Sequence, residues 1–181
     1  MIFNGHTTVN SDSKFIVLDT FALQNSDERI KKAQYHNILT YCWEQVSKDK
    51  ERKVLVCDEA WIMIDKQVPQ TLIFLRNIAK RCRKYNGSLV IISHSVVDFL
   101  DPSIKLYGQS ILDMAGFKIL MGADGQNLEE MKELYKLTEA EYDLIYSRQM
   151  GQALFMAGTS RLSIKFDIFP YEFDYFNKKV G

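Results

Sequence analysis

The sequence predicts an α/β domain with a mainly parallel sheet, helices on both faces and a β-hairpin at its C-terminal end. Short apolar runs alternate along the chain with stretches of helical period, which is typical of strand–helix–strand units. The run "KVLVCDEA" (53–60) lacks polar–apolar alternation, which indicates a central strand buried on both faces. Near the end, "GQALFMA" and "RLSIKFDI" flank "GTS", a hairpin pattern with Gly158 in the turn.

The predicted elements follow from local signals. Turn-prone "NSDS" precedes the β-branched run "KFIVLDT" (14–20), which we expect to be a strand, and further strands are expected at 88–95 and 117–122. Residues 27–48 have a helical period, with Ile30, Ile38, Cys42 and Val46 among its apolar positions.

A second helix is expected from Pro69, a favoured first-turn residue, to about residue 85, where Asn86-Gly87 ends it. Its predicted inner face comprises Leu72, Ile73, Ile78, Ala79 and Cys82. A helix is also expected over 127–135, and Thr138 with Glu141 forms a capping box for a short one that follows.

Composition limits the class of protein. The 181 residues, 46% of them hydrophobic, fit a single domain over 1–181. The 23 basic and 23 acidic side chains cancel, so nucleic-acid binding would require a local basic patch. The three scattered cysteines predict reduced thiols, no apolar run reaches the roughly 18 residues of a membrane span, and the N-terminus does not resemble a signal peptide. We therefore expect a soluble cytoplasmic protein, able to dock on a membrane complex.

Two adjacent carboxylates, Asp58 and Glu59, follow the apolar run that begins at Lys53. In open α/β sheets ligands bind at the C-terminal ends of strands. A carboxylate there can hold Mg²⁺, usually through water, while its neighbour polarises the water that attacks a γ-phosphate. The pattern is of the Walker B type, although an acidic turn at a strand exit is a common alternative.

The next apolar strand also ends in polar residues, Ser93-His94-Ser95, which could sense the γ-phosphate of a nucleotide beside Asp58. A buried histidine bonded to backbone is the alternative for His94. Between the two strands lies a basic helix containing Arg76, Lys80, Arg81, Arg83 and Lys84. An arginine at a subunit boundary can stabilise phosphoryl-transfer charge in a neighbour's site. Nucleic-acid contact or a solvated helix face are the other interpretations.

The order of these motifs resembles the VirB-type conjugation ATPases, the motors of type IV secretion systems. "KFIVLDT", "VLVCDEAWIMID", "FLRNIAKRCRKYNGSLVIISHSVVDFLD", "SILDMAGFKILMG" and "GQALFMAGTSRLSIKFDIFPYEFDYF" carry the resemblance across nearly the whole chain. It implies a RecA-like P-loop NTPase fold and an ATPase that powers substrate transfer or pilus assembly. It also implies a homo-oligomeric ring and other secretion components at the inner face of the membrane as partners.

Residue roles follow from the same resemblance. Asp58 would help to hold Mg²⁺ and Glu59 would be the catalytic carboxylate. His94 stands where the family more often has a γ-phosphate-sensing glutamine. Arg81 and Arg83 match the family's basic helix and would act in a neighbouring subunit. A recurrent arginine near the end of the domain matches Arg161, which we assign to nucleotide binding.

The chain has no G-x-x-x-x-G-K-[ST] loop, whose backbone N–H groups and lysine cradle the phosphates. In the resembling family this Walker A segment lies upstream. We therefore expect the C-terminal portion of a RecA-like ATPase domain, inactive alone, that does not bind ATP and Mg²⁺ tightly.

Two rival interpretations are weaker. ABC transporter ATPases also place Asp-Glu before a strand that ends near a switch histidine, but "VSKDKERK" stands where their "LSGGQ" signature is expected. A non-catalytic assembly or nucleic-acid-contacting module that keeps the fold is the alternative from a different class, and the neutral net charge speaks against strong nucleic-acid binding.

Overall fold

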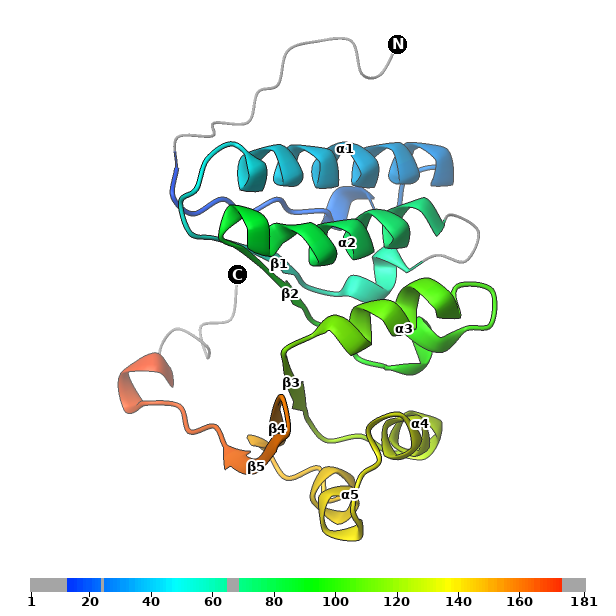
Figure 1. Cartoon of the computed structure of the whole chain (residues 1–181), viewed down its shortest axis with the longest axis vertical. Coiled ribbons are helices and arrows are strands. Elements are labelled where there is room, and N and C mark those ends of the chain that lie inside the picture. Colours follow the sequence, from blue (N-terminus) through cyan, green and yellow to red (C-terminus); the bar gives the residue numbers. More distant parts are fainter. Residues whose placement is uncertain (1–12, 24, 65–68, 174–181) are drawn as a thin grey trace.

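The computed structural model describes residues 13–23, 25–64 and 69–173. Figure 1 shows two packed groups of elements, each an α/β arrangement. The upper group contains the parallel strands β1 (Lys53–Cys57) and β2 (Gly87–Ile91) with helices α1 (Glu28–Ser47), α2 (Pro69–Arg81) and α3 (Lys105–Met114). The lower group contains the antiparallel strands β3 (Phe117–Leu120), β4 (Gln152–Ala157) and β5 (Ser160–Lys165) with helices α4 (Gly125–Tyr135) and α5 (Glu139–Tyr146). The predicted α/β class and the C-terminal hairpin are confirmed.

The helices of the upper group form where the sequence predicts α1 and α2, and α3 is an addition to the predicted set. The side chain of Asp27 caps α1 by accepting the N–H of Arg29 at 2.9 Å. The helix α2 begins at Pro69 and passes into a short 3-10 helix, Cys82–Tyr85, before Asn86 adopts a left-handed conformation with φ of 56°. The other 3-10 helices described are Phe21–Leu23, Ala60–Met63, Val97–Leu100 and Pro170–Glu172.

The core of the upper group lies between one face of the β1–β2 pair and the three helices. Its buried side chains come from α1, β1, α2, α3 and the segment before α3: Leu39, Cys57, Leu72, Leu75, Phe99, Ile104 and Ile111. Each fully buried leucine stabilises the fold by about 2–3 kcal/mol relative to leaving it exposed. Burial also raises the pKa of the Cys57 thiol to about 12, which keeps it protonated and unreactive. The three cysteines are free thiols, as predicted.

The opposite face of the β1–β2 pair is apolar but uncovered by described residues. Val54 and Val56 are 59% and 54% exposed, and Val90 and Ile92 are also exposed. The prediction that this strand is buried on both faces, with helices on each side of the sheet, is therefore not met in the described part of the chain. Because both faces of β1 carry apolar side chains, the strand is suited to packing on both sides.

The predicted strand at 14–20 does not form. These residues have no strand assignment, and Phe15 and Val17 are 82% and 72% exposed. A strand requires a neighbour that accepts and donates ladder hydrogen bonds, and no described residue pairs with this segment. The β-branched pattern is therefore a strand signal without a partner strand.

The lower group departs from the predicted mainly parallel sheet. β3 pairs with β4 in antiparallel register, and β4 pairs with β5 across the turn that contains Gly158, whose φ is +58°. The sheet order is β3-β4-β5, separate from the parallel pair. One face packs on α4 and α5 through buried residues: Leu120, Ala123, Leu128, Leu137, Ile145, Leu154 and Met156. Chain order alone could not distinguish these pairings, because β3 follows the same strand–helix alternation as β1 and β2.

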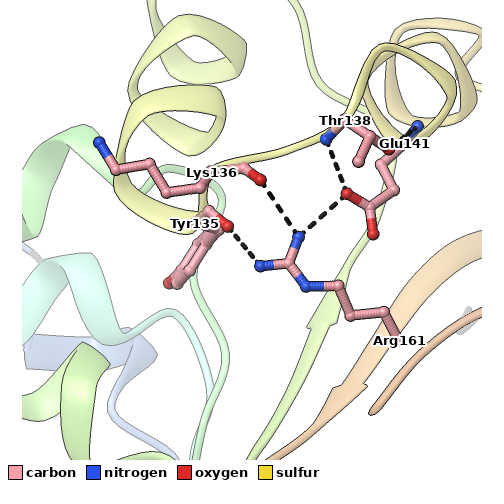
Figure 2. A network of polar contacts seen from close by, with 5 residues as sticks. All are labelled: Tyr135, Lys136, Thr138, Glu141 and Arg161. Carbon is pink, nitrogen blue, oxygen red and sulfur yellow. Dashed lines mark hydrogen bonds and ion pairs between the residues drawn. The ribbon is translucent and has the colours of Figure 1, made fainter. Parts of the chain in front are cut away.

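Arg161 on β5 ties the hairpin to the junction between α4 and α5 (Figure 2). Its guanidinium donates to the backbone oxygen of Tyr135 at 2.6 Å, to that of Lys136 at 3.4 Å, and to the Glu141 carboxylate at 3.0 Å. Glu141 also completes the predicted capping box with Thr138. The hydrogen bonds within this box, followed by Arg161, hold the pKa of Glu141 below its usual range.

Replacing Arg161 with Ala is expected to lower the free energy of unfolding by about 1–3 kcal/mol, because two carbonyls and a carboxylate lose a charged donor. Urea unfolding followed by circular dichroism measures this. The control is Arg148→Ala, which removes an exposed ion pair with Asp124 and should cost under about 1 kcal/mol. Equal effects of the two substitutions would show that Arg161 does not hold the hairpin in place.

Candidate functional site

The candidate site lies where β1 and β2 end side by side. Ile92 donates its N–H to the oxygen of Cys57 at 3.0 Å, and Ala60 donates to the oxygen of Ile92 at 2.9 Å. The backbone contacts of the parallel pair thus continue beyond both strands. They hold the Asp58-Glu59 turn beside the segment that follows β2, as the two polar strand ends predicted.

Glu59 occupies the left-handed region, with φ of 51° and ψ of 44°. This conformation is unfavourable for a residue other than glycine and tends to occur at functional sites. It turns the Glu59 side chain toward two donors. Trp61 donates its indole N–H to Oε2, and Nε2 of His94 lies 2.9 Å from Oε1. Because an ionised carboxylate only accepts hydrogen bonds, Nε2 of His94 carries the proton in this contact.

The hydrogen bond from Trp61, followed by that from His94, lowers the pKa of Glu59. The side chains of His94 and Glu59 are 78% and 44% exposed, so solvent screens the pair and its stabilising effect is small. The favourable contribution of Glu59 is present above the pKa of an unfolded glutamate and is lost as pH falls through the lowered folded value. Glu59 is therefore ionised at neutral pH and available to accept a proton.

The backbone of the His94 segment is held by Asn127, near the start of α4. Asn127 accepts the N–H of Val96 at 2.9 Å through Oδ1 and donates to the backbone oxygen of His94 at 3.2 Å through Nδ2. The hydroxyl of Ser95 lies 3.4 Å from the same Oδ1. One amide side chain from the lower group thus positions the loop that carries His94.

Trp61 and Asn127 are contributions to the site that the sequence did not reveal. Trp61 belongs to the "DEAW" segment, but no sequence rule predicts that its indole bonds the Glu59 carboxylate. Asn127 is 33 residues from His94, and a polar residue near a helix start has many other uses.

Asp58 fits the predicted role of a Mg²⁺ ligand in part. Its side chain is exposed, and Oδ1 accepts the N–H of Glu59 at 3.0 Å, which leaves Oδ2 for a water or a metal. Mg²⁺ is commonly held by one or two carboxylates together with waters and substrate phosphates. Within 13–23, 25–64 and 69–173 no group of three or more His, Cys, Asp or Glu residues could hold a metal by itself. Asp58 is therefore suited to a metal that arrives with a phosphate-bearing ligand.

The predicted arginines lie away from Glu59. Arg81 and Arg83 are at the end of α2 and in the 3-10 helix before β2, beside the opposite ends of the strands. Five strand residues span roughly 16 Å, so neither side chain reaches Glu59 of the same chain. The Arg81 guanidinium lies 4.8 Å from the ring centroid of Trp43, and Arg161 is engaged in the lower group.

Comparison with known proteins decides the family. The TraG P-loop domain matches residues 10–155. The chain belongs to this P-loop family. This match agrees with the P-loop NTPase fold that the family resemblance implied, and the Asp58-Glu59 pair lies within the matched residues.

The chain is similar to VirB4 proteins and to a CagE protein. The chain is 46% identical to the structure of VirB4 of Thermoanaerobacter pseudethanolicus, with a TM-score of 0.85 over 92% of this chain and 45% of that one. It is 32% identical over 101 residues to the type IV secretion system protein CagE of Helicobacter pylori, which is 56% of this chain and 10% of that protein. It is 27% identical over 147 residues to VirB4 of Bartonella quintana, covering 80% and 17%.

These similarities confirm the predicted resemblance to type IV secretion motor ATPases. The chain spans under half of the VirB4 structure and at most about a fifth of the two other relatives. No helix in the described residues is long and apolar enough to cross a bilayer.

Replacing Trp61 with Phe is expected to raise the pKa of Glu59, because the substitution removes the largest cause of its lowered value. Carboxyl carbon shifts of Glu59, followed by NMR as pH is varied, measure the change. The control Trp43→Phe alters an indole on α1, whose neighbours are Tyr85 and Arg81, and should leave the Glu59 titration unchanged. An unaltered titration in Trp61→Phe would exclude the indole as the group that sets this pKa.

Proposed function

We propose that this TraG P-loop domain is the C-terminal part of the motor domain of a type IV secretion ATPase, in which Glu59 is the catalytic carboxylate. The observation that carries the proposal is the contact between Glu59 and His94 at the adjoining ends of two parallel strands. Ligands of open α/β sheets bind at this edge. Membership of a P-loop family supports a nucleoside triphosphate as the ligand.

ATP with Mg²⁺ supplies the transferable phosphoryl group when it is bound in the complete site. Asp58 would hold the Mg²⁺ ion through water. Glu59 uses two of its four acceptor positions for Trp61 and His94, which leaves two for an attacking water. Glu59 orients that water and accepts its proton as the water oxygen attacks the γ-phosphorus, and ADP leaves. His94 holds the Glu59 carboxylate in position through Nε2. When the imidazole rotates away from Glu59, the same N–H donates a hydrogen bond to the γ-phosphate.

The phosphate-binding loop comes from another segment in this proposal. The 181 residues contain no G-x-x-x-x-G-K-[ST] sequence. The uncovered face of the β1–β2 pair supports the idea, because Val54, Val56, Val90 and Ile92 form a contiguous apolar surface on neighbouring paired strands. Such surfaces on soluble proteins are usually covered by another part of the protein or by a partner. A segment that covers this face would lie next to the C-terminal ends of β1 and β2, where Glu59 is located.

The complete motor works as a homo-oligomeric ring on the cytoplasmic side of a membrane complex, with other secretion components as partners. Arg81 or Arg83 acts in a neighbour's site, since neither can reach Glu59 of its own chain. A nucleotide contact by Arg161 requires its guanidinium to leave Glu141 and the α4 carbonyls. Nothing favours the alternative of a non-catalytic module.

Replacing Glu59 with Gln in the complete protein is expected to reduce ATP turnover about 10²–10⁴-fold, because the amide cannot accept the proton of water. ATP binding should persist. Phosphate release and nucleotide binding are measured on the same sample. The control Glu51→Gln neutralises an exposed carboxylate at the other end of β1 and should leave turnover unchanged. Undiminished turnover in the Glu59 variant would remove it from the mechanism.

The 181-residue chain alone is expected to give no detectable heat with Mg-ATP in calorimetry and no hydrolysis. A carboxylate pair without a phosphate cradle lacks most of the groups that hold the triphosphate. Clear binding would mean that another segment of this chain holds the phosphates, and the roles of Asp58, Glu59 and His94 would have to be reassigned.

A further inference from the structure

The strand β5 forms an open edge of the second sheet. The order β3-β4-β5 leaves its outer side without a partner strand among the residues that the structure describes. Its register with β4 is one-to-one over all 6 residues, so the strand has no bulge, and its sequence contains no proline. Bulges and proline are devices by which natural sheets prevent further pairing at an edge. β5 therefore keeps the geometry that a further strand needs.

The hydrogen-bond pattern of the hairpin shows which backbone groups of β5 face outward. Phe166 donates its N–H to the oxygen of Gly151 at 2.8 Å. In an antiparallel ladder the hydrogen-bonded pairs recur at every second residue, so Ile164 and Leu162 are the residues that bond β4. The N–H and C=O groups of the alternate residues point away from β4: Arg161, Ser163 and Lys165. These donors and acceptors are the ones that an added strand would bond.

A pocket of about 220 Å³ lies beside this edge, between β5 and α5. We call the outer edge of β5 together with this pocket the β5–α5 groove. Figure 2 shows the Arg161 guanidinium directed to the Glu141 carboxylate, and this ion pair neutralises both charges. The pocket is therefore suited to an apolar side chain, because the rest of its lining is apolar except for a hydroxyl. The lining residues are Ala140, Glu141, Leu144, Leu154, Arg161 and Ser163.

We propose that the β5–α5 groove binds an extended peptide segment of a partner protein, which adds to β5 as a further antiparallel strand. Antiparallel pairing is the more stable arrangement, and each outward-facing residue then exchanges two backbone hydrogen bonds with the residue opposite it. A peptide residue opposite Ser163 directs its side chain to the pocket, because directly opposite residues share one face of the sheet. Valine or isoleucine fits this position, since β-branched residues favour strands. Backbone bonds with a side-chain pocket are a known mode of peptide recognition.

The charges along the groove favour a segment of a different protein over a second copy of β5. Two copies paired symmetrically about Ser163 would place Lys165 opposite Arg161, and like charges in that position are destabilising. Lys165 lies on the same face as Ser163, and its ion pair with Asp167 at 3.3 Å is exposed. An exposed pair contributes little, so Lys165 is available to a carboxylate of the peptide. The partner segment therefore carries an acidic residue two positions before the valine or isoleucine.

The test uses the 181-residue chain and the fluorescein-labelled peptide GSTETVTVSG, in which glutamate precedes a valine by two positions. Fluorescence anisotropy should show saturable binding. Ser163→Pro removes the central outward N–H and keeps the bonds to β4, so it should weaken binding about tenfold. Ala140→Phe places a large side chain at the exposed rim of the pocket and should weaken binding as well.

Charge reversal distinguishes a cross-strand contact from an effect on folding. The wild type should prefer the glutamate peptide about threefold over the same peptide with lysine in its place, and Lys165→Glu should reverse this preference. Amide hydrogen exchange followed by NMR gives a second readout. The N–H groups of Arg161, Ser163 and Lys165 should exchange rapidly in the free chain and become protected when the peptide binds. The N–H of Leu162, which bonds β4, should be protected in both states.

The matched control is Lys105→Glu, which reverses an exposed charge on α3 and should change the affinity less than about twofold. Circular dichroism verifies that each variant is folded. Equal weakening by the control, or outward β5 amides that stay unprotected, would overturn the proposal. Absence of binding at about 1 mM peptide would do so too. Dimerisation in sedimentation velocity that Ser163→Pro abolishes would assign the edge to a second copy instead. None of these measurements depends on ATP hydrolysis.

Discussion

The parallel pairing of β1 with β2 is the constraint on which the rest of the structure depends. Its register, from Lys53 opposite Gly87 to Cys57 opposite Ile91, fixes both ends of the pair at once. At one end the ladder continues through Ala60 and brings Glu59 beside the residues that follow β2. At the other end it brings the loop before β1 beside Asn86. A slip of one residue would reverse the faces of β2 and remove its inward side chains from the core.

The pairing also separates two chemically different edges. The Glu59 edge carries the carboxylates of Asp58 and Glu59, whereas the opposite edge carries the cationic side chains of Lys50, Arg52 and Arg83. About 16 Å of strand between them exceeds the Debye length of physiological salt, so exposed groups on the two edges affect each other little. The lowered pKa of Glu59 therefore comes from its own edge, through Trp61 and His94.

The sequence predicted elements whose signals are local. Asp27 and Pro69 mark helix starts, Thr138 with Glu141 forms the expected capping box, and Gly158 occupies the hairpin turn. It also indicated that the polar residues after β1 and after β2 serve one site, and the structure adds that His94 contacts Glu59 directly. Strand pairings that depend on distant segments could not be predicted from the sequence. The run at 14–20 has strand composition without a partner among the described residues, and the pattern of β3 does not say which strand lies beside it. Asn127 could not be assigned either, since its role depends on how the two groups of elements pack.

Asn127 connects that packing to the chemistry of the site. Its side chain belongs to α4, and it bonds the backbone on both sides of Ser95. The carbonyl that it contacts belongs to His94, whose imidazole in turn holds Glu59. The contact is polar and directional, so it weakens steeply when distance or angle changes. A displacement of α4 relative to β2 therefore acts first on the His94 backbone and then on the orientation of the Glu59 carboxylate. The lower group, stabilised by the Arg161 contacts, is thus part of what positions the candidate catalytic residue, although none of its side chains touches that carboxylate.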